Sequence, residues 1–333
     1  MIGVVAAPPA QKANEDTTVV TPDAARAALL DPYDQLLRRS SPFGDVVLPG
    51  HAASHLMHVT DLVWTLHILG GLGLTAAERD SWAARINRDQ DPQTGMFHYP
   101  PGESHIDAHA TWQCVAALNM LGRRPHHRHV CLEPLLTVDG YRAWCEAYDP
   151  ATSHHRFFLG VLAAASAPVG AAWKAVFGDW YERHQDPATG FPFHADSPHR
   201  LSPAFLLTTK CFLLCGSVPR PGRIVETVLA FQAAHGGFTG DDLPGYMDMD
   251  AAFLLHLLGP SVPHAGSRIE TALVRLSGFV ETVLADGPRH ERLLARPHQA
   301  LAVCGTLSVL WRHLEGRAAP FPWAELEHYR AAV

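Results

Sequence analysis

The sequence predicts an all-α protein, an (α/α)6 toroid in which inner and outer helices alternate around a closed ring. The first observation is a repeated turn: the text QDPQTG at 90–95 returns as QDPATG at 185–190. Half of that spacing is about 47 residues, the size of a helical-hairpin repeat. The second observation is that the helices around these turns are of two kinds, amphipathic and apolar nearly all round. A helix that is apolar on every side must be enclosed by others.

The enclosed helices carry long runs rich in alanine and leucine, such as AFLLTTKCFLLCG at 204–216 and DAAFLLHLLG at 250–259. These runs lack the period-2 alternation of strands. Several end in a glycine followed by a proline, which is typical of helix termination. We expect six enclosed helices, beginning near His58, Asp107, His155, Pro203, Met249 and Gln299.

The amphipathic helices lie between them and have one apolar stripe. In 221–235, for example, Ile224, Val225, Val228 and Leu229 recur at helical spacing. We expect such outer helices at 75–90, 138–148, 169–184, 221–235 and 267–284, with 22–39 as a sixth. An open superhelix is the alternative, but open arrays seldom require inner helices this apolar.

The chain of 333 residues is expected to form a flexible N-terminal segment, 1–20, and a single toroid domain, 21–333. The N-terminus lacks the basic and apolar regions of a signal peptide. No run of about 18 apolar residues predicts a membrane span. Six cysteines without metal-site spacing are expected to be reduced thiols in the core. These features predict a cytoplasmic protein without stable membrane insertion.

The charge pattern bears on partners. The net charge is −7, and no lysine or arginine run marks a groove for nucleic acid. The outer helices show no heptad seam, so we expect a monomer or a weak homodimer that acts on a small-molecule substrate.

Polar residues gather where the inner helices are expected to begin. If all inner helices run in one direction, their N-termini share one mouth. The chain has 22 histidines, and helix N-termini welcome aspartate but disfavour protonated histidine. The excess of histidine therefore predicts a polar cavity or a metal site. The residues concerned are His55, His58, Asp61, His105, Asp107, His109, His154, His155, Arg156, His199, Arg200, Asp248, Asp250, His298 and Gln299.

Structural roles explain some of these residues equally well. Asp107 and Asp248, taken singly, are better explained as helix N-caps. In the string H-x-D-x-H, His105 and His109 share a helix face while Asp107 points elsewhere, which weakens a three-ligand site there. Four aromatic residues on the inner helices fit core packing at least as well as a ligand wall: Trp64, Trp112, Phe157 and Phe253.

The stretch GGFTGDDLPGYMDMDAAF at 236–253 resembles the prenyltransferase/terpenoid-cyclase toroid superfamily. In protein prenyltransferase β-subunits a GGF-type turn leads to an Asp-x-Cys-Tyr pattern, and a later inner helix opens with histidine. The resemblance implies that Asp248, Asp250 and His298 bind a divalent metal, Zn or Mg, although Asp250 stands where the family has cysteine.

Squalene–hopene-type cyclases carry Asp-x-Asp-Asp at the same place. Asp248 and Asp250 match its first two acids, and Ala251 replaces the last. This resemblance implies that Asp250 is a general acid that protonates an alkene. The chain departs from the superfamily in lacking the regular tryptophans of its repeats and a DDxxD motif. The similarity of repeat pattern covers roughly 50–315.

The leading hypothesis is a terpenoid cyclase-like enzyme, an isomerase, lyase or transferase acting on an isoprenoid or similar apolar substrate. Asp250, Asp248 and His298 are its candidate catalytic residues. The aromatic content of 9 % argues against an ideal cavity for cations. The candidate substrate-binding residues are His58, Asp61, His105, Asp107, His109, His155, Arg156 and Tyr246.

Three alternatives remain open. A carbohydrate-active (α/α)6 hydrolase or lyase would use paired carboxylates and histidine acid/base groups. A metal-dependent enzyme of another class would use Asp248, Asp250 and His298 as ligands. A non-catalytic binding toroid would keep the fold without the chemistry.

Overall fold

The computed structural model is helical in every part of the chain that it describes. No β-strand occurs in those residues, and the only strand-like pairing there is an isolated antiparallel bridge between Gln90 and Phe97. The all-α prediction is thereby confirmed. The residues described are 19–49, 51–70, 73–99, 107–148, 157–166, 171–193 and 197–331. Most of the expected N-terminal segment, as well as His105, His154, His155 and Arg156, lies outside them.

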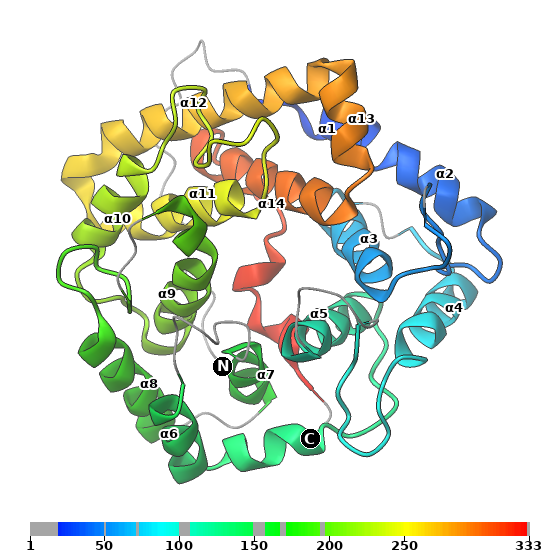
Figure 1. The fold of residues 1–333 in the computed structure, drawn as a ribbon, viewed down its shortest axis with the longest axis horizontal. Helices are drawn as coiled ribbons and strands as arrows, with labels where there is room; N and C mark the ends of the chain where they lie inside the picture. The colour runs from blue at the N-terminus through cyan, green and yellow to red at the C-terminus, as the bar shows by residue number, and fades with distance from the viewer. Residues whose placement is uncertain are drawn as a thin grey trace.

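Six helices form the inner layer and make a closed circle of contacts. Each packs against the next in the order α3, α5, α7, α9, α11 and α14, and α14 returns to α3. Figure 1 shows them around the centre of the molecule. Their bounds are Leu56–Ile68 for α3, Asp107–Met120 for α5, Phe157–Ser166 for α7, Leu201–Cys215 for α9, Tyr246–Leu258 for α11 and Pro297–Leu314 for α14.

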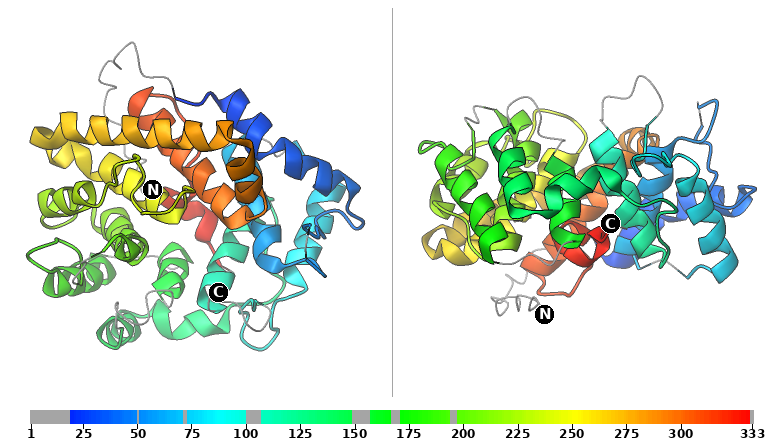
Figure 2. Two further views of the ribbon diagram at one scale, coloured as in Figure 1. Left: turned by 45° about the horizontal axis from the view of Figure 1, so that its top comes forward. Right: turned by 90° about the horizontal axis from the view of Figure 1, so that it is seen from below.

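The remaining helices lie outside this circle (Figure 1), and the side view shows both layers at one level (Figure 2). Most of the expected outer helices are present within a few residues of their predicted bounds. The segment 22–39 forms two short helices, because Pro32 opens a new one. The outer bounds are Pro22–Leu29 for α1, Asp31–Arg39 for α2, Ala76–Asn87 for α4, Val138–Glu146 for α6, Ala171–His184 for α8, Pro221–Ala230 for α10, Gly266–Ala285 for α12 and Gly287–Leu294 for α13.

The glutamine of the repeated turn links two successive repeats through hydrogen bonds. The Gln90 amide donates to the carbonyl of Gly95 in its own turn and to that of His127 in the next repeat, both at 2.9 Å. Gln185 does the same with Gly190 at 2.6 Å and Pro219 at 2.7 Å. Since the side chain satisfies carbonyls of two successive repeats, it ties them together.

Gln232 makes the third copy of this link, to Gly236 at 2.8 Å and to Ala272 at 2.7 Å. Gly236 has a φ of 104°, and a Cβ there would lie 2.3 Å from the Arg275 carbonyl oxygen. Glycine is therefore required by both the backbone conformation and the close approach of the next repeat.

The C-terminal segment occupies the centre of the ring, which the sequence did not predict. After α14 the chain turns back as two short 3₁₀ turns, Pro322–Ala324 (η6) and Leu326–Tyr329 (η7), and η7 contacts α5 and α7 (Figure 1). The Asn119 amide of α5 donates to the His328 carbonyl at 2.7 Å. The Ser308 hydroxyl of α14 donates to the Pro320 carbonyl at 2.5 Å. These bonds fix the segment against the inner helices.

The structure also bears on the expectations about membrane spans and about the cysteines. In the described part of the chain, no helix combines the length and the apolarity that crossing a bilayer requires. All six cysteines are free thiols, as expected, but the expected core position holds for only four of them, because Cys131 is partly exposed and Cys215 is exposed.

Candidate functional site

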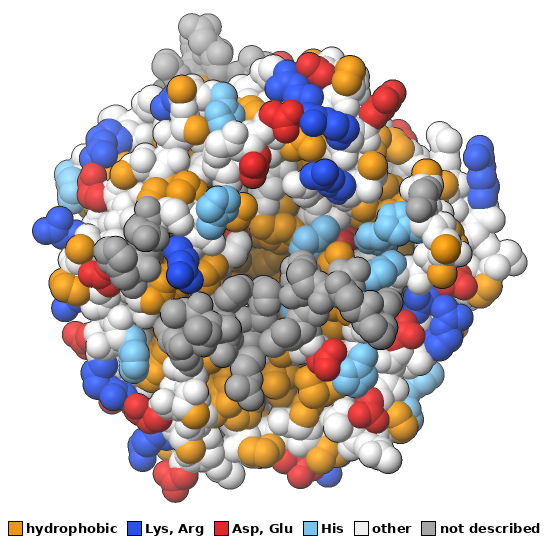
Figure 3. Space-filling view, viewed as in Figure 1, with side chains coloured by type: hydrophobic (Ala, Val, Ile, Leu, Met, Phe, Trp, Pro, Cys, Tyr) orange, Lys and Arg blue, Asp and Glu red, His pale blue; other side chains and the backbone are white. Residues whose placement is uncertain are grey.

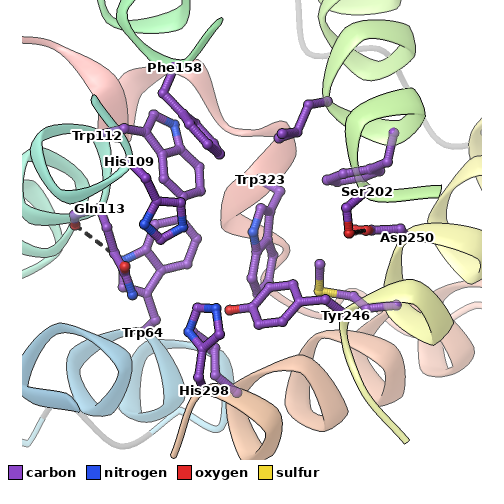
Figure 4. A pocket seen from close by; sticks show the side chains of 14 residues that line it. Trp64, His109, Trp112, Gln113, Phe158, Ser202, Tyr246, Asp250, His298 and Trp323 are labelled. Atoms are coloured by element: carbon purple, nitrogen blue, oxygen red, sulfur yellow. Dashed lines mark hydrogen bonds between the residues drawn. The ribbon is translucent and has the colours of Figure 1, made fainter. Parts of the chain in front are cut away.

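A cavity of about 170 Å³ lies at the centre of the ring, between the inner helices and the C-terminal segment. Figure 3 shows hydrophobic side chains in the hollow on this face, with histidines around it, and Figure 4 shows the lining side chains. Each of the six inner helices contributes at least one polar or aromatic side chain to the wall, and the contribution of α7 is Phe158. The lining residues are Trp64, His109, Trp112, Gln113, Phe158, Ser202, Phe205, Leu206, Tyr246, Met249, Asp250, His298, Leu301 and Trp323.

Aromatic rings dominate one side of this cavity. The ring centroids of Trp64 and Trp112 lie 5.2 Å apart, and those of Trp112 and Phe158 4.6 Å apart. Trp323, from the C-terminal segment, lies 4.9 Å from Trp64. The low overall aromatic content was therefore a poor guide to this cavity, because three of the eight tryptophans line it. Their faces carry the negative potential that attracts cations.

Asp250 stands on the opposite side, on α11, and is 1 % exposed (Figure 4). Ser202, in the first turn of α9, donates its hydroxyl hydrogen to Asp250 Oδ2 at 2.5 Å. Burial raises the pKa of Asp250 well above its ordinary value; the Ser202 bond opposes this rise and the charge of Asp248 adds to it. The site therefore favours a protonated carboxylic acid facing an aromatic cavity.

Asp248, two residues earlier, has a different role. Its carboxylate accepts the backbone N–H of Phe238 at 2.7 Å and that of Gly245 at 2.8 Å. It thereby caps the start of α11 and fixes the preceding loop, and it is not among the cavity-lining residues. Burial raises the pKa of Asp248, and the two N–H groups oppose that rise. Its contact with the site is electrostatic, through Asp250.

A hydrogen-bonded chain of polar side chains forms the third part of the site. Asp61, fully buried on α3, accepts the Gln113 amide at 2.5 Å and faces His298 Nδ1 at 3.1 Å. The Tyr99 hydroxyl donates to Gln113 Oε1 at 2.6 Å and lies 3.1 Å from His109 Nδ1.

The donors and acceptors of this chain set the tautomers of its two imidazoles. Because the one hydroxyl hydrogen of Tyr99 goes to Gln113, His109 Nδ1 must donate to the Tyr99 oxygen. Because the Asp61 carboxylate only accepts, His298 Nδ1 must donate to it. In a neutral His298 the basic lone pair is then on Nε2, as in other carboxylate-oriented histidines.

Tyr246 lies between the acid and the imidazoles (Figure 4). Its ring centroid is 4.3 Å from that of His298. Burial, with the charges of Asp61 and Asp250, raises the pKa of Tyr246 well above its ordinary value, so the phenol stays neutral.

The structure brings together five of the residues predicted for the site and leaves others apart. Asp61, His109, Tyr246, Asp250 and His298 meet at or directly behind the cavity wall. The predicted substrate-binding residues His58 and Asp107 do not line it.

His58 and Asp107 instead contact residues outside the cavity wall. The His58 ring lies 5.0 Å from the His55 ring at the start of α3. Asp107 is about half exposed and pairs with His98 at 2.9 Å. His105, His155 and Arg156, as stated above, lie outside the described residues.

The three predicted metal ligands are not gathered around one point. Asp248, Asp250 and His298 do not place their ligand atoms within 4.8 Å of one another, the separation that a shared ion requires. Both oxygens of Asp248 accept backbone hydrogen bonds instead. Within the described ranges, the group of three that meets this condition is His67, Glu325 and His328, at the other end of α3.

Several residues of the candidate site were not predicted. Gln113 and Ser202 are polar residues in apolar helices, which is a weak sequence signal for a buried hydrogen-bonding role. Trp323 carries no such signal, because only the return of the C-terminal segment brings it to the cavity.

Comparisons with known proteins add no identification: no protein-family model, curated protein or solved structure matches the chain.

Proposed function

We propose that the chain is an (α/α)6 toroid enzyme of the terpenoid-cyclase type, in which Asp250 starts the reaction by protonating an alkene. The observation that carries the proposal is the buried side chain of Asp250, which lines a cavity with aromatic walls. The closed circle of contacts among α3, α5, α7, α9, α11 and α14 supports the toroid assignment, because an open superhelix would leave its first and last inner helices apart.

The first step requires an acid that is protonated and only weakly solvated. Burial raises the pKa of Asp250 and so favours its protonated form; the charge of Asp248 adds to this rise, and the Ser202 hydrogen bond opposes it. Transfer of that proton to an alkene carbon forms a C–H bond and leaves a carbocation and an Asp250 carboxylate. Ser202 is placed to stabilise that carboxylate through its hydrogen bond.

The carbocation would form beside the aromatic side of the cavity. Trp64, Trp112 and Trp323 present three indole rings there. A desolvated cation over an aromatic face is stabilised by about 2 kcal/mol or more. The apolar lining also excludes the water that would otherwise quench the cation.

The last step requires a base at the other side of the cavity. We assign it to His298, whose Nε2 lone pair is set by the Asp61 contact at Nδ1. Removal of a proton from the carbon next to the cation restores a double bond and leaves an imidazolium paired with Asp61. The net reaction is an isomerisation or cyclisation, and proton return from His298 to Asp250 completes the cycle.

The size of the cavity limits the substrate. A cavity of about 170 Å³ is slightly larger than an engineered apolar cavity of about 150 Å³ that binds benzene. The described walls therefore suit about one or two isoprene units rather than a triterpene. Since no DDxxD motif is present, the reaction would not start by metal-assisted loss of diphosphate.

The carbohydrate-active alternative has less support. Glycoside hydrolases normally require two carboxyl groups facing the bond that breaks. Among the described residues that line the cavity, Asp250 alone carries a carboxyl group, because Asp61 is fully buried behind Gln113 and His298.

The test is turnover of short linear isoprenoid alkenes, with and without a terminal diphosphate, followed by mass spectrometry of the products. We expect a product with the mass of the substrate from the wild-type chain and none from Asp250→Asn. Equal turnover by Asp250→Asn, or binding of oligosaccharides but not of isoprenoids, would refute the proposal.

A further inference from the structure

A second cluster of chemically competent side chains lies at the end of α3 away from Asp61, where the C-terminal segment crosses the ring. His67, in the last turn of α3, meets Glu325 and His328 of the C-terminal segment. Their ligand atoms all lie within 4.8 Å of one another. The rings of His67 and His328 are 5.0 Å apart and nearly perpendicular, at 81°.

We propose that His67, Glu325 and His328 bind a divalent transition metal of the Zn²⁺ class, which fastens the C-terminal segment to α3. Two imidazoles and one carboxylate, with a fourth position left for water, form a donor set that suits tetrahedral Zn²⁺. Mg²⁺ and Ca²⁺ prefer sites made of oxygen ligands alone. The site is distinct from the cavity and from the Asp248, Asp250 and His298 set.

The distances are close to those of a bound ion. His328 Nε2 is 2.9 Å from Glu325 Oε2. With metal–ligand bonds of about 2.0–2.1 Å and a tetrahedral angle, two such atoms lie about 3.4 Å apart. A separation of the two side chains by about half an ångström would therefore admit the ion.

The surroundings hold the carboxylate in position. Glu325 Oε1 accepts the Phe321 N–H at 3.1 Å and has Arg312 Nη2 at 3.8 Å. These contacts occupy one oxygen and leave Oε2 toward the imidazoles. The Asn119 bond to the His328 carbonyl fixes the backbone of the second ligand. Hydrogen bonds that orient ligands in this way are a regular feature of metal sites.

Burial is intermediate at all three residues, so an ion can enter from solvent. Two residues before Glu325, Trp323 lines the cavity. A metal here would thus fix the segment that supplies part of the cavity wall.

The test is a titration of the chelator-treated full chain with Zn²⁺ by calorimetry, and with Co²⁺ by visible absorption. We expect one site of micromolar or tighter affinity and a tetrahedral Co²⁺ spectrum. His67→Ala and His328→Ala should each weaken binding by more than the roughly 10–100-fold that loss of a residue supporting a ligand costs.

The matched control is His313→Ala. His313 and His256 form another imidazole pair, with Nδ1 atoms 3.2 Å apart, on the inner helices α14 and α11. This variant should keep the affinity of the wild type. Equal weakening in His67→Ala and His313→Ala, or binding that saturates only in the millimolar range, would show adventitious binding by histidines in general and overturn the proposal.

Glu325→Gln provides a second measurement if the alanine variants unfold. The amide keeps the Phe321 hydrogen bond but removes the ligand charge. We expect it to fold, to bind Zn²⁺ more weakly and to lose the rise in Tm that Zn²⁺ gives the wild type. A Zn²⁺-dependent rise in Tm that is unchanged in Glu325→Gln would contradict the assignment.

Discussion

The two polar sides of the cavity hold their ionisable groups in opposite ways. On one side Asp250 is buried with one hydrogen bond, from Ser202, and its pKa is raised well above the ordinary value. On the other side Asp61 accepts hydrogen from both Gln113 and His298. The difference teaches that two carboxyl groups of similar depth can differ in their hydrogen-bond partners: Ser202 alone contacts Asp250 among the described residues, whereas Gln113 and His298 both contact Asp61.

The largest effect is expected on the acid side. Asp250→Asn replaces a neutral acid by a neutral amide of similar size, so the variant should fold, but it cannot donate the proton. Turnover of the proposed isoprenoid substrate should fall by about 10²–10⁴-fold, the usual contribution of a general acid. The measurement is product formation under saturating substrate.

The control for that variant is Asp241→Asn, an exposed acid in the loop before α11. It should leave turnover within twofold of the wild type. Similar losses in both variants would show that negative charge near α11, rather than a proton on Asp250, is required.

The second largest effect is a loss of folding stability when Asp61, the partner of His298, is removed. Asp61→Ala would leave the Gln113 amide and His298 Nδ1 without their acceptor in a buried site. We expect the free energy of unfolding to fall by about 2–4 kcal/mol. Denaturant unfolding measures this, and Asp107→Ala, at a half-exposed ion pair, should cost no more than about 1 kcal/mol. Equal losses of stability in Asp61→Ala and Asp107→Ala would show that the buried hydrogen bonds of Asp61 stabilise the fold no more than a half-exposed ion pair does.

A smaller effect separates the two acids of α11. Asp248→Ala would leave the N–H groups of Phe238 and Gly245 unpaired, so we expect a loss of about 1–3 kcal/mol in stability. Asp248→Asn keeps one acceptor oxygen and should lose less. If Asp248→Asn abolished turnover at unchanged stability, Asp248 would be a catalytic acid rather than a cap.

The smallest effect is the pH dependence of stability. The folded pKa of Asp250 is raised above its unfolded value, so its contribution to stability is fully present below the unfolded pKa. That contribution is lost as pH rises through the folded pKa, because a buried carboxylate must then form. We expect the free energy of unfolding of Asp250→Asn to rise relative to that of the wild type as pH rises, and denaturant unfolding at a series of pH values measures this. Parallel curves would mean that Asp250 is not perturbed.

Much of the fold could be predicted, because its signals are local. An inner helix such as α11 is apolar all round, and an outer helix such as α10 is not. The turn glutamines Gln90, Gln185 and Gln232 lie 95 and 47 residues apart, which is two steps and one step of the repeat. The prediction that Asp248 is an N-cap was correct about its role at the helix start but not about its position. Gly245 is the N-cap of α11, and Asp248, the third residue of the helix, accepts the Gly245 N–H.

The site was harder to predict, because it depends on contacts between residues far apart in the chain. Ser202 meets Asp250 from a different helix, and Gln113 meets Asp61 from 52 positions away. Trp323 reaches the cavity only because the C-terminal segment folds back. No spacing in the sequence encodes that return, nor the meeting of His67 with Glu325 and His328.

The central claim is that Asp250 carries a proton while it faces the cavity. The most direct measurement is the infrared difference spectrum between the wild type and Asp250→Asn at neutral pH. We predict a carbonyl band of a protonated carboxylic acid in the wild type that is absent from the variant. A difference spectrum that shows only the bands of an ionised carboxylate would contradict the account.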